Sequence, residues 1–549
     1  MEMRSMNRLK PMKKLAMLTA VGMLIPMVGV GMPQQVFAAE VQQTAESGVQ
    51  LKKMIIAPDS LLPGYEADMN NIATRYMGRN ITVNDLNTAV TEVTNYYREH
   101  GYPAATAYLP AQANDKGEVQ IAVAPGKYGK ITVDNQSRLS DDVINRCIAG
   151  LHVGDVIDGR TLETAIYNIK DLKGVKVGAV MSPGANDGET DVVVRVENGK
   201  SSQYMLYAEN HGSKAAGRYR YGILGDWYNI GGHGEHIGVN GLISNSNQKN
   251  IGIRYEMPFG HSNTKVGFGY SHSNYELGSE VAALGVKGNS YNFSLFASTP
   301  LWKTTNSGLN VNYGLDYRKL KDEWHPLGIE YTNKRTGKSF HVGADGYQRW
   351  KTNAMSYDVT LYYGNVSSDE YSIAGIPLPT NTLNTGKYTK ATANVNFVQS
   401  LTGSFDMVLK LQGQQASRAL DSSERLFLGG ANGVRAYPQG EASGDNGYLG
   451  SLELRYHTKV EGLSFGLFYD TGHVNMRDAG IGTTLSGWGI GVSYSKPNEF
   501  FARIDYARRI GLPNNRECKI VCVKSNCADL FYAPYWGKQL KGWISNGKT

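Results

Sequence analysis

The sequence predicts two small α+β units followed by a large all-β transmembrane barrel. From residue 203 onward, apolar and polar residues alternate in segments of about ten, separated by turn residues. Gly and Tyr are abundant, at 64 and 34 of 549 residues, whereas only 19% of residues are charged. After residue 40 no apolar run reaches the roughly 18 residues that a membrane-spanning helix needs. A membrane role of this part of the chain therefore requires strands in a barrel, or a surface anchor.

Residues 1–38 have the pattern of a secretory signal peptide. A basic stretch precedes the apolar residues 15–30, and Val36 and Ala38 are the short residues expected before a cleavage site. We predict cleavage before Ala39, which leaves residues 39–50 as a short N-terminal segment. The mature chain is then expected to cross the inner membrane.

The positive charge of the chain lies at its two ends. Residues 1–38 and 514–549 each carry a net charge of +4, and residues 39–513 carry −1, which together give the formal +7. A basic patch on the body of the protein, of the kind that binds nucleic acid, is therefore not expected.

The first part of the mature chain repeats one pattern of elements. Residues 51–126 read as strand, helix, helix, strand, strand, with Asn84 as the predicted N-cap of the longer helix. Residues 127–199 repeat the same order at similar length, which indicates an internal repeat. Cys147 lies among apolar positions of a predicted helix, so we interpret it as a buried core residue and not as a nucleophile.

Residues 200–513 are predicted to form the barrel. Leu463, Phe465 and Leu467, for example, alternate with Ser464 and Gly466. A soluble sandwich has the same period, but a single soluble domain seldom exceeds roughly 250–300 residues. In an outer-membrane barrel the apolar face meets lipid and the other face lines the lumen. We count about 15 strands before residue 513 and expect an even number, with a sixteenth strand further on.

The tail, residues 514–549, departs from this pattern. Its cysteines, Cys518, Cys522 and Cys527, have a C-x3-C-x4-C spacing that is not common for zinc, and we predict no metal site. The segment lacks a clean alternating run of about ten residues. We interpret it as an atypical, frameshifted or foreign end, and whether it supplies the sixteenth strand stays open.

A glycine-rich loop with one arginine near its tip lies late in the barrel, at residues 428–438. A phosphate cradle is one interpretation of such a loop, but no Gly-Lys-Ser/Thr follows and no helix is predicted after it. Within this loop, Val434-Arg435-Ala436-Tyr437 resembles the V-R-G-[YF] motif at the tip of the sixth extracellular loop in the BamA/TpsB superfamily of POTRA-bearing barrels, with Ala436 in place of the usual Gly.

Three further motifs carry the same resemblance. They are Gly450-x-x-Glu453, Phe468-x-Asp470, and the first-hairpin residues Asn210, Gly212, Gly217 and Arg218. The resemblance implies that Gly450, Glu453, Phe468 and Asp470 are the lumen partners of the loop. Taken together, residues 51–513 resemble the TpsB branch, the two-partner secretion transporters of the haemolysin and filamentous-haemagglutinin exporter type.

The resemblance implies a fold, a location and a function. Residues 51–126 and 127–199 would be two periplasmic POTRA domains, and the barrel would lie in the outer membrane of a diderm bacterium. The protein would capture a large unfolded exoprotein, adhesin-like or haemolysin-like, through its POTRA domains and export it, with or without activating it. Outer-membrane lipid and the barrel assembly machinery would be its other partners. We expect a monomer without cofactor, and whether a plug helix exists stays open.

Alternation also predicts a contact inside the pore. Glu453 and Asp470 both fall on the lumen face, and a guanidinium on a loop folded into the lumen needs a carboxylate partner. We predict that Arg435 pairs with Asp470, with Glu453 as a second candidate, and that this contact holds the loop inside the barrel.

Three other functions are alternatives to export. An outer-membrane protein assembly factor of the same superfamily usually carries more POTRA domains, and a passive porin needs neither these domains nor a loop arginine. An enzyme is not expected, and no catalytic residue is assigned. His233-Gly234-Glu235-His236 lacks the H-E-x-x-H spacing of a zinc protease, and there is no G-x-S-x-G elbow.

Overall fold

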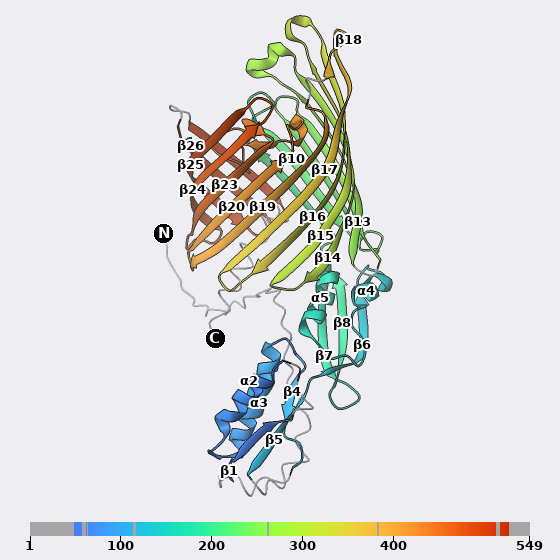
Figure 1. Cartoon of the computed structure of the whole chain (residues 1–549), viewed down its shortest axis with the longest axis vertical. Helices are drawn as coiled ribbons and strands as arrows, with labels where there is room; N and C mark the ends of the chain where they lie inside the picture. The colour runs from blue at the N-terminus through green and yellow to red at the C-terminus, as the bar shows by residue number, and fades with distance from the viewer. Residues whose placement is uncertain are drawn as a thin grey trace, which may run out of the picture.

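The computed structural model shows two small α/β units beneath a large β-barrel (Figure 1). It describes residues 49–525 with the exception of 58–61, 63, 113–116, 261–262, 381–383 and 512–515. The predicted signal peptide, most of the segment 39–50, and the tail beyond residue 525 lie outside the described residues. Of the helices described, none is long and apolar enough to cross a membrane.

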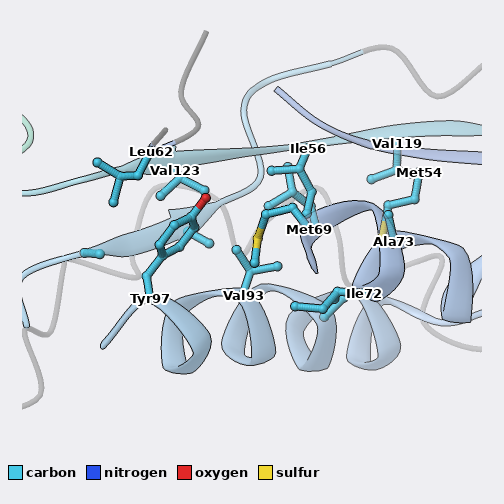
Figure 2. Packing of buried hydrophobic residues seen from close by; sticks show 14 of the residues in the cluster. Met54, Ile56, Leu62, Met69, Ile72, Ala73, Val93, Tyr97, Val119 and Val123 are labelled. Atoms are coloured by element: carbon cyan, nitrogen blue, oxygen red, sulfur yellow. The ribbon is translucent and has the colours of Figure 1, made fainter. Parts of the chain in front are cut away.

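The first unit packs two helices against a small sheet. Its elements are β1 (Val49–Gln50), β2 (Lys53–Ile56), α2 (Glu66–Tyr76), β3 (Asn80–Ile81), α3 (Val83–Glu99), β4 (Thr106–Tyr108) and β5 (Glu118–Ala124). Strand β5 lies in the middle of a three-stranded sheet, parallel to β2 and antiparallel to β4. Figure 2 shows Met54 and Val119 of the sheet above Ile72 and Val93 of the helices, all fully buried.

The N-cap of helix α3 lies two residues before the predicted N-cap, Asn84. Thr82 is the N-cap, because its hydroxyl accepts a hydrogen bond from the backbone N–H of Asp85 (3.2 Å). The Asp85 carboxylate in turn accepts from the backbone N–H of Thr82 (2.7 Å). This reciprocal capping box satisfies two helix-end donors, which Asn84 inside the first turn cannot do.

The second unit repeats the first. Its elements are β6 (Lys127–Gln136), α4 (Asp141–Cys147), α5 (Gly159–Lys170), β7 (Val175–Pro183) and β8 (Glu189–Asn198). Strand β8 is again central, parallel to β6 and antiparallel to β7. Cys147 is buried in the core of this unit, as predicted, and burial raises the pKa of its thiol to about 12.

Sixteen long strands of the described chain form the barrel, each antiparallel to its neighbours. They are β9 (Ser202–Glu209), β10 (Arg220–Tyr228), β11 (His236–Ser244), β12 (Lys249–Phe259), β13 (Thr264–Glu276), β14 (Lys287–Lys303), β15 (Ser307–Trp324), β16 (Tyr331–Arg349), β17 (Asn353–Ile373), β19 (Gly386–Thr402), β20 (Phe405–Ala416), β23 (Asn446–His457), β24 (Leu463–Met476), β25 (Ile481–Lys496), β26 (Phe500–Arg509) and β27 (Arg516–Ser525). A short strand, β18 (Ile376–Pro377), turns back and pairs antiparallel with the end of β17.

The last strand corrects the predicted end of the barrel at residue 513. β27 lies in the segment interpreted as an atypical tail, yet it pairs with β26 over nine residues and with β9 over five. Ile520 stands opposite Ile504, and Cys518 and Cys522 occupy the alternate positions on either side. Cysteine is a small apolar residue, so positions 518, 520 and 522 share an apolar character, while Val521 and Val523 interrupt the alternation beyond Ile520.

The two faces of the barrel wall differ as the alternation predicts. On β24, the outward Leu467 is 54% exposed, whereas its neighbour Phe468 is 2% exposed. The outward faces of the other strands carry a similar band of large apolar and aromatic side chains, exposed on the protein surface. Such a surface suits lipid, and it leaves the opposite face of each strand for the lumen.

The second α/β unit contacts the rim of the barrel. The Asp171 carboxylate at the end of α5 binds Lys265 of β13 (3.1 Å) and Lys303 of β14 (2.5 Å). The Tyr167 hydroxyl lies 3.1 Å from the Thr305 hydroxyl in the turn between β14 and β15. Burial raises the pKa of the Asp171 carboxyl, but the two lysines outweigh it and lower that pKa to about 2. This end of the barrel is therefore the one that the α/β units face.

Candidate functional site

The segment 417–445, here called the pore loop, connects β20 to β23 and folds into the barrel. It contains a short helical turn, η5 (Ser422–Glu424), and a two-stranded hairpin of β21 (Leu426–Leu428) and β22 (Ala442–Gly444). Its side chains contact inward-facing residues of β15, β16 and β19, and also of β23, β24 and β26. A loop that reaches all of these strands must lie in the lumen.

The tip of the pore loop is a compact turn. The backbone N–H of Gly430 donates to the Tyr437 carbonyl (2.9 Å), and that of Tyr437 donates to the Val434 carbonyl (3.0 Å). Gly430 has φ +89°, a conformation that side chains other than glycine rarely adopt. The turn places Val434, Ala436 and Tyr437 in an apolar cluster on the inner wall, where all three are buried.

Arg435 extends from this tip to two carboxylates on neighbouring strands. Its Nε and Nη2 donate to the two oxygens of Asp470, both at 2.8 Å, and its backbone N–H donates to the same carboxylate at 3.0 Å. Its Nη1 donates to Glu453 Oε2 at 2.8 Å. Both predicted contacts are thus present, and the fork geometry is the bidentate arrangement that distinguishes Arg from Lys.

Phe468 completes the surroundings of this guanidinium. The Arg435 Cζ lies 3.4 Å from the centroid of the Phe468 ring, a cation–π contact inside the barrel wall. Asp470 is fully buried and also accepts from the Ser451 hydroxyl (2.7 Å). The F-x-D spacing puts both side chains on the same inward face of β24, one touching the face of the guanidinium and the other its edge.

Further charged residues, not among the predicted site residues, hold Glu453. Arg503 of β26 donates to Glu453 Oε2 (2.9 Å) and to Asp505 Oδ2 (2.7 Å), and Arg455 donates to Glu453 Oε1 (3.1 Å). Three guanidinium groups and three carboxylates therefore form one buried network, here called the tip network. The signal was present in the sequence, because Arg503 and Asp505 occupy the polar face of the last clear alternating strand.

Ala436 fits the space that its neighbours leave. A Cβ built on Gly487 of β25 would come within 2.6 Å of the Ala436 Cβ, so the absence of a side chain at 487 makes room for Ala436. The Ala436 carbonyl accepts from Arg509 Nε (3.2 Å), and the Arg509 guanidinium lies 4.5 Å from the Tyr437 ring centroid. Ala436, which stands where the motif usually has Gly, therefore fits beside Gly487 in this docked position of the tip.

The first-hairpin residues lie next to the pore loop. Asn210 and Gly212 follow β9, and the Gly212 N–H donates to the Arg218 carbonyl (3.2 Å) across the turn. A Cβ on Gly212 would lie 1.9 Å from the Gly217 carbonyl oxygen, so this turn closes only with glycine. The backbone N–H of Gln439 in the pore loop donates to the carbonyl of the residue between Asn210 and Gly212 (3.3 Å).

Gly450 is the one predicted lumen residue that faces the other way. It pairs with Leu411, an exposed outward residue, and a Cβ built on it would approach the Leu411 side chain at 3.6 Å. Because Gly450 and Glu453 are three residues apart on one strand, they necessarily lie on opposite faces. Gly450 therefore does not contact Arg435, and its assignment as a lumen partner is wrong.

A second set of contacts, which was not predicted from the sequence, holds the base of the pore loop. Glu424 accepts from Lys390 (2.6 Å) and from Arg318, and Asp421 pairs with Arg335. These cations come from β19, β15 and β16. We call this set the base anchor. The loop is therefore attached to the barrel wall at two separate places.

Comparison with known proteins agrees with this architecture. The family described as "Haemolysin secretion/activation protein ShlB/FhaC/HecB" matches residues 188–494, and the ShlB-type POTRA domain matches residues 63–126. The heme/hemopexin transporter protein HuxB of Haemophilus influenzae is 27% identical over 78% of this chain and 80% of its own length. The outer membrane transporter CdiB of Dickeya dadantii is 21% identical over 77% and 76% of the two chains.

Two solved structures share the fold. CdiB from Escherichia coli superposes with a TM-score of 0.66 at 18% identity, covering 87% of this chain and 90% of that one. BamA from Haemophilus ducreyi lacking POTRA domains 1–3 superposes with a TM-score of 0.53 at 14% identity, covering 87% of this chain and all of that one.

Proposed function

We propose a function for this chain from the family to which it belongs, the haemolysin secretion/activation proteins ShlB/FhaC/HecB. It is an outer-membrane transporter that exports a partner exoprotein by two-partner secretion, with POTRA units in the periplasm. The observation that carries this function is the pore loop, which is held inside the barrel by the buried contact of Arg435 with Asp470. A passive porin needs neither this contact nor the α/β units that precede the barrel.

The two α/β units would receive the exported chain. Residues 63–126 match a POTRA domain, and residues 127–199 have the same sheet order, which supports their assignment as a second one. Within the part of the chain that the structure describes, the edge strands of the two three-stranded sheets are β2 and β4 in the first unit and β6 and β7 in the second. An extended segment of an unfolded exoprotein can add to such an edge as a further strand.

The second unit would then pass this segment to the barrel, whose rim it contacts through Asp171. The pore loop occupies the lumen, so the exported chain must share the lumen with it or displace it. Folding of the exoprotein outside the cell would supply the driving force.

For the exported protein, only a broad class can be proposed. The relatives carry names that refer to heme/hemopexin transport and to outer-membrane transport. For this chain we propose a large adhesin-like or haemolysin-like exoprotein, insertion by the barrel assembly machinery, and action as a monomer without a cofactor.

Binding of the partner can be tested with a deletion. The full chain and a variant lacking residues 51–126 would be compared for binding of the N-terminal domain of a candidate partner exoprotein. We expect binding to be lost in the variant, provided that its barrel is folded. Retained binding would place recognition elsewhere in the chain. In planar bilayers, the same domain should change the current through the full chain, whereas a steady pore indifferent to it would favour a porin.

The role of the pore-loop contact can be tested with a charge swap. Arg435→Asp and Asp470→Arg should each reduce secretion, and the double variant should recover part of it. The exposed pair Lys334 and Glu370 provides the matched control, since its swap should leave secretion unchanged. If the double variant secretes no better than either single variant, the pairing does not support export.

A further inference from the structure

The outward wall of the barrel has a groove across five neighbouring strands, β14 to β17 and β19, with a volume of about 540 Å³. Its walls are side chains of the lipid-facing band, on β14, β15, β16 and β17. They are Phe293, Leu295, Leu315, Tyr317, Phe340 and Tyr363. The groove is thus apolar and aromatic over most of its length.

Lysines border one end of this groove. Tyr317, Lys338, Asn365 and Lys387 stand opposite one another on β15, β16, β17 and β19, and residues paired in this way project from the same face of a sheet. Tyr317 is outward and exposed, so Lys338 and Lys387 are outward too. Two strand spacings separate the two lysines, which is about 10 Å. Lys319 adds a third cation at the next outward position of β15.

The height of the lysines places them at the edge of the apolar band. Along β16, eleven residues separate Lys338 from Arg349 at the end that the α/β units face. At about 3.4 Å per residue and a tilt near 40°, this is a rise of about 28 Å. The apolar band of such barrels is about 25 Å tall. Lys338 and its neighbours in the row therefore lie at the headgroup level of the outer leaflet.

These lysines are not neutralised by the protein. Further toward the outer end, Lys321 pairs with Glu323 and Lys334 pairs with Glu370. Within the described residues, Lys319, Lys338 and Lys387 form no ion pair. Asp316 also borders the groove, but its carboxylate is turned inward to His341 (3.0 Å).

We propose that the groove binds a phosphorylated lipid of the outer leaflet. Its acyl chains lie against the aromatic and aliphatic walls, and Lys338 and Lys387 bind its phosphate groups, with Lys319 beside them. Lysine binds phosphate as a point charge, and each basic residue at a charged membrane surface adds to the attraction. The outer-membrane location rests on the proposed function, but the groove and its lysines do not.

The test compares lipid binding by the purified full chain in detergent. The probe is a bis-phosphorylated lipid A, and native mass spectrometry measures its retention against the same lipid with both phosphates removed. The variant K338Q/K387Q should bind the phosphorylated lipid about 30-fold more weakly. The matched control is K249Q, because Lys249 is an exposed lysine at the outer end of β12, away from the groove; its binding should equal that of the parent chain.

Three outcomes would overturn the proposal. They are equal binding by K338Q/K387Q and the parent chain, equal retention of the lipid without phosphates, and displacement of the lipid by millimolar inorganic phosphate alone. Heat-modified migration on gels confirms that each variant is folded before it is compared. Partner-domain binding, measured on the same samples, separates failure of this proposal from failure of the proposed function.

Discussion

Replacing Asp470 with Asn should release the tip of the pore loop from the barrel wall. The carboxylate accepts three hydrogen bonds from Arg435, two from the guanidinium and one from the backbone. Asn has nearly the same shape, but it carries no charge and can offer only one oxygen. It would also turn an NH₂ group toward a guanidinium that has nothing to accept it.

The size of the effect follows from burial. Removing one member of a buried ion pair typically costs about 3–5 kcal/mol, because the remaining charge is left uncompensated. Here Glu453 still binds Arg435, at 2.8 Å, so we expect the lower end of that range. About 3 kcal/mol corresponds to a roughly 150-fold rise in the ratio of released to docked loop.

Labelling of a buried tip residue would measure this ratio. Val434 is completely buried against the inner wall. A Val434→Cys variant, made in a chain whose native cysteines are replaced, should react slowly with a water-soluble maleimide. Adding D470N should raise the labelling rate by about two orders of magnitude if labelling requires release.

A matched control and a clear contrary result are available. E370Q neutralises a carboxylate of an exposed pair on the outer wall, and it should leave the labelling rate unchanged. If D470N labels as slowly as its parent while a denatured sample labels quickly, the apolar packing of the tip holds the loop without help from the ion pair.

Three further predictions concern other parts of the chain. D171N should loosen the second α/β unit from the barrel rim, seen as faster proteolysis near residues 199–201. The pKa of the Asp171 carboxyl is lowered to about 2, so its contribution to docking of the second unit is complete above the ordinary pKa near 4 and is lost as the pH falls toward 2. Acid should therefore loosen the parent chain but should not loosen D171N further. Equal cleavage of parent and variant at neutral pH would contradict this prediction. T82A should destabilise the first unit by about 1 kcal/mol through loss of its helix cap, and unchanged hydrogen exchange in α3 would refute it. G212A should lower the yield of folded barrel, because its Cβ would collide with the Gly217 carbonyl, whereas G403A, where the space is open, should not; equal yields would show that the hairpin can adjust.

The fold could be predicted from the sequence where one short period repeats. Alternation along β24 fixes which side chains face the lumen, so the contact between Arg435 and Asp470 followed once the loop was expected inside the barrel. Whether the tail supplies the sixteenth strand stayed open, because the consecutive apolar residues Val521, Cys522 and Val523 interrupt the alternation. Gly450 was misplaced because a motif was carried over whole, although its spacing to Glu453 puts the two residues on opposite faces.

The base anchor could not be predicted in the same way. Glu424 meets Arg318 and Lys390, which lie on strands far from it in the sequence. Alternation gives the face of a strand, but it does not give the height at which a loop meets the wall. That height depends on the path of about thirty loop residues, and nothing local in the sequence records it.

The tip network also has a consequence for the ions that the pore admits. While the loop is docked, Arg435 contributes one of the three guanidinium groups that face Glu453, Asp470 and Asp505. When the tip leaves, the carboxylates stay on the rigid wall and one positive charge goes with the loop. If only the tip leaves and the base anchor stays in place, the wall beside Asp470 becomes more negative by one charge, so this stretch of the lumen should attract cations more strongly. The position of the tip would then be readable from the reversal potential across a salt gradient.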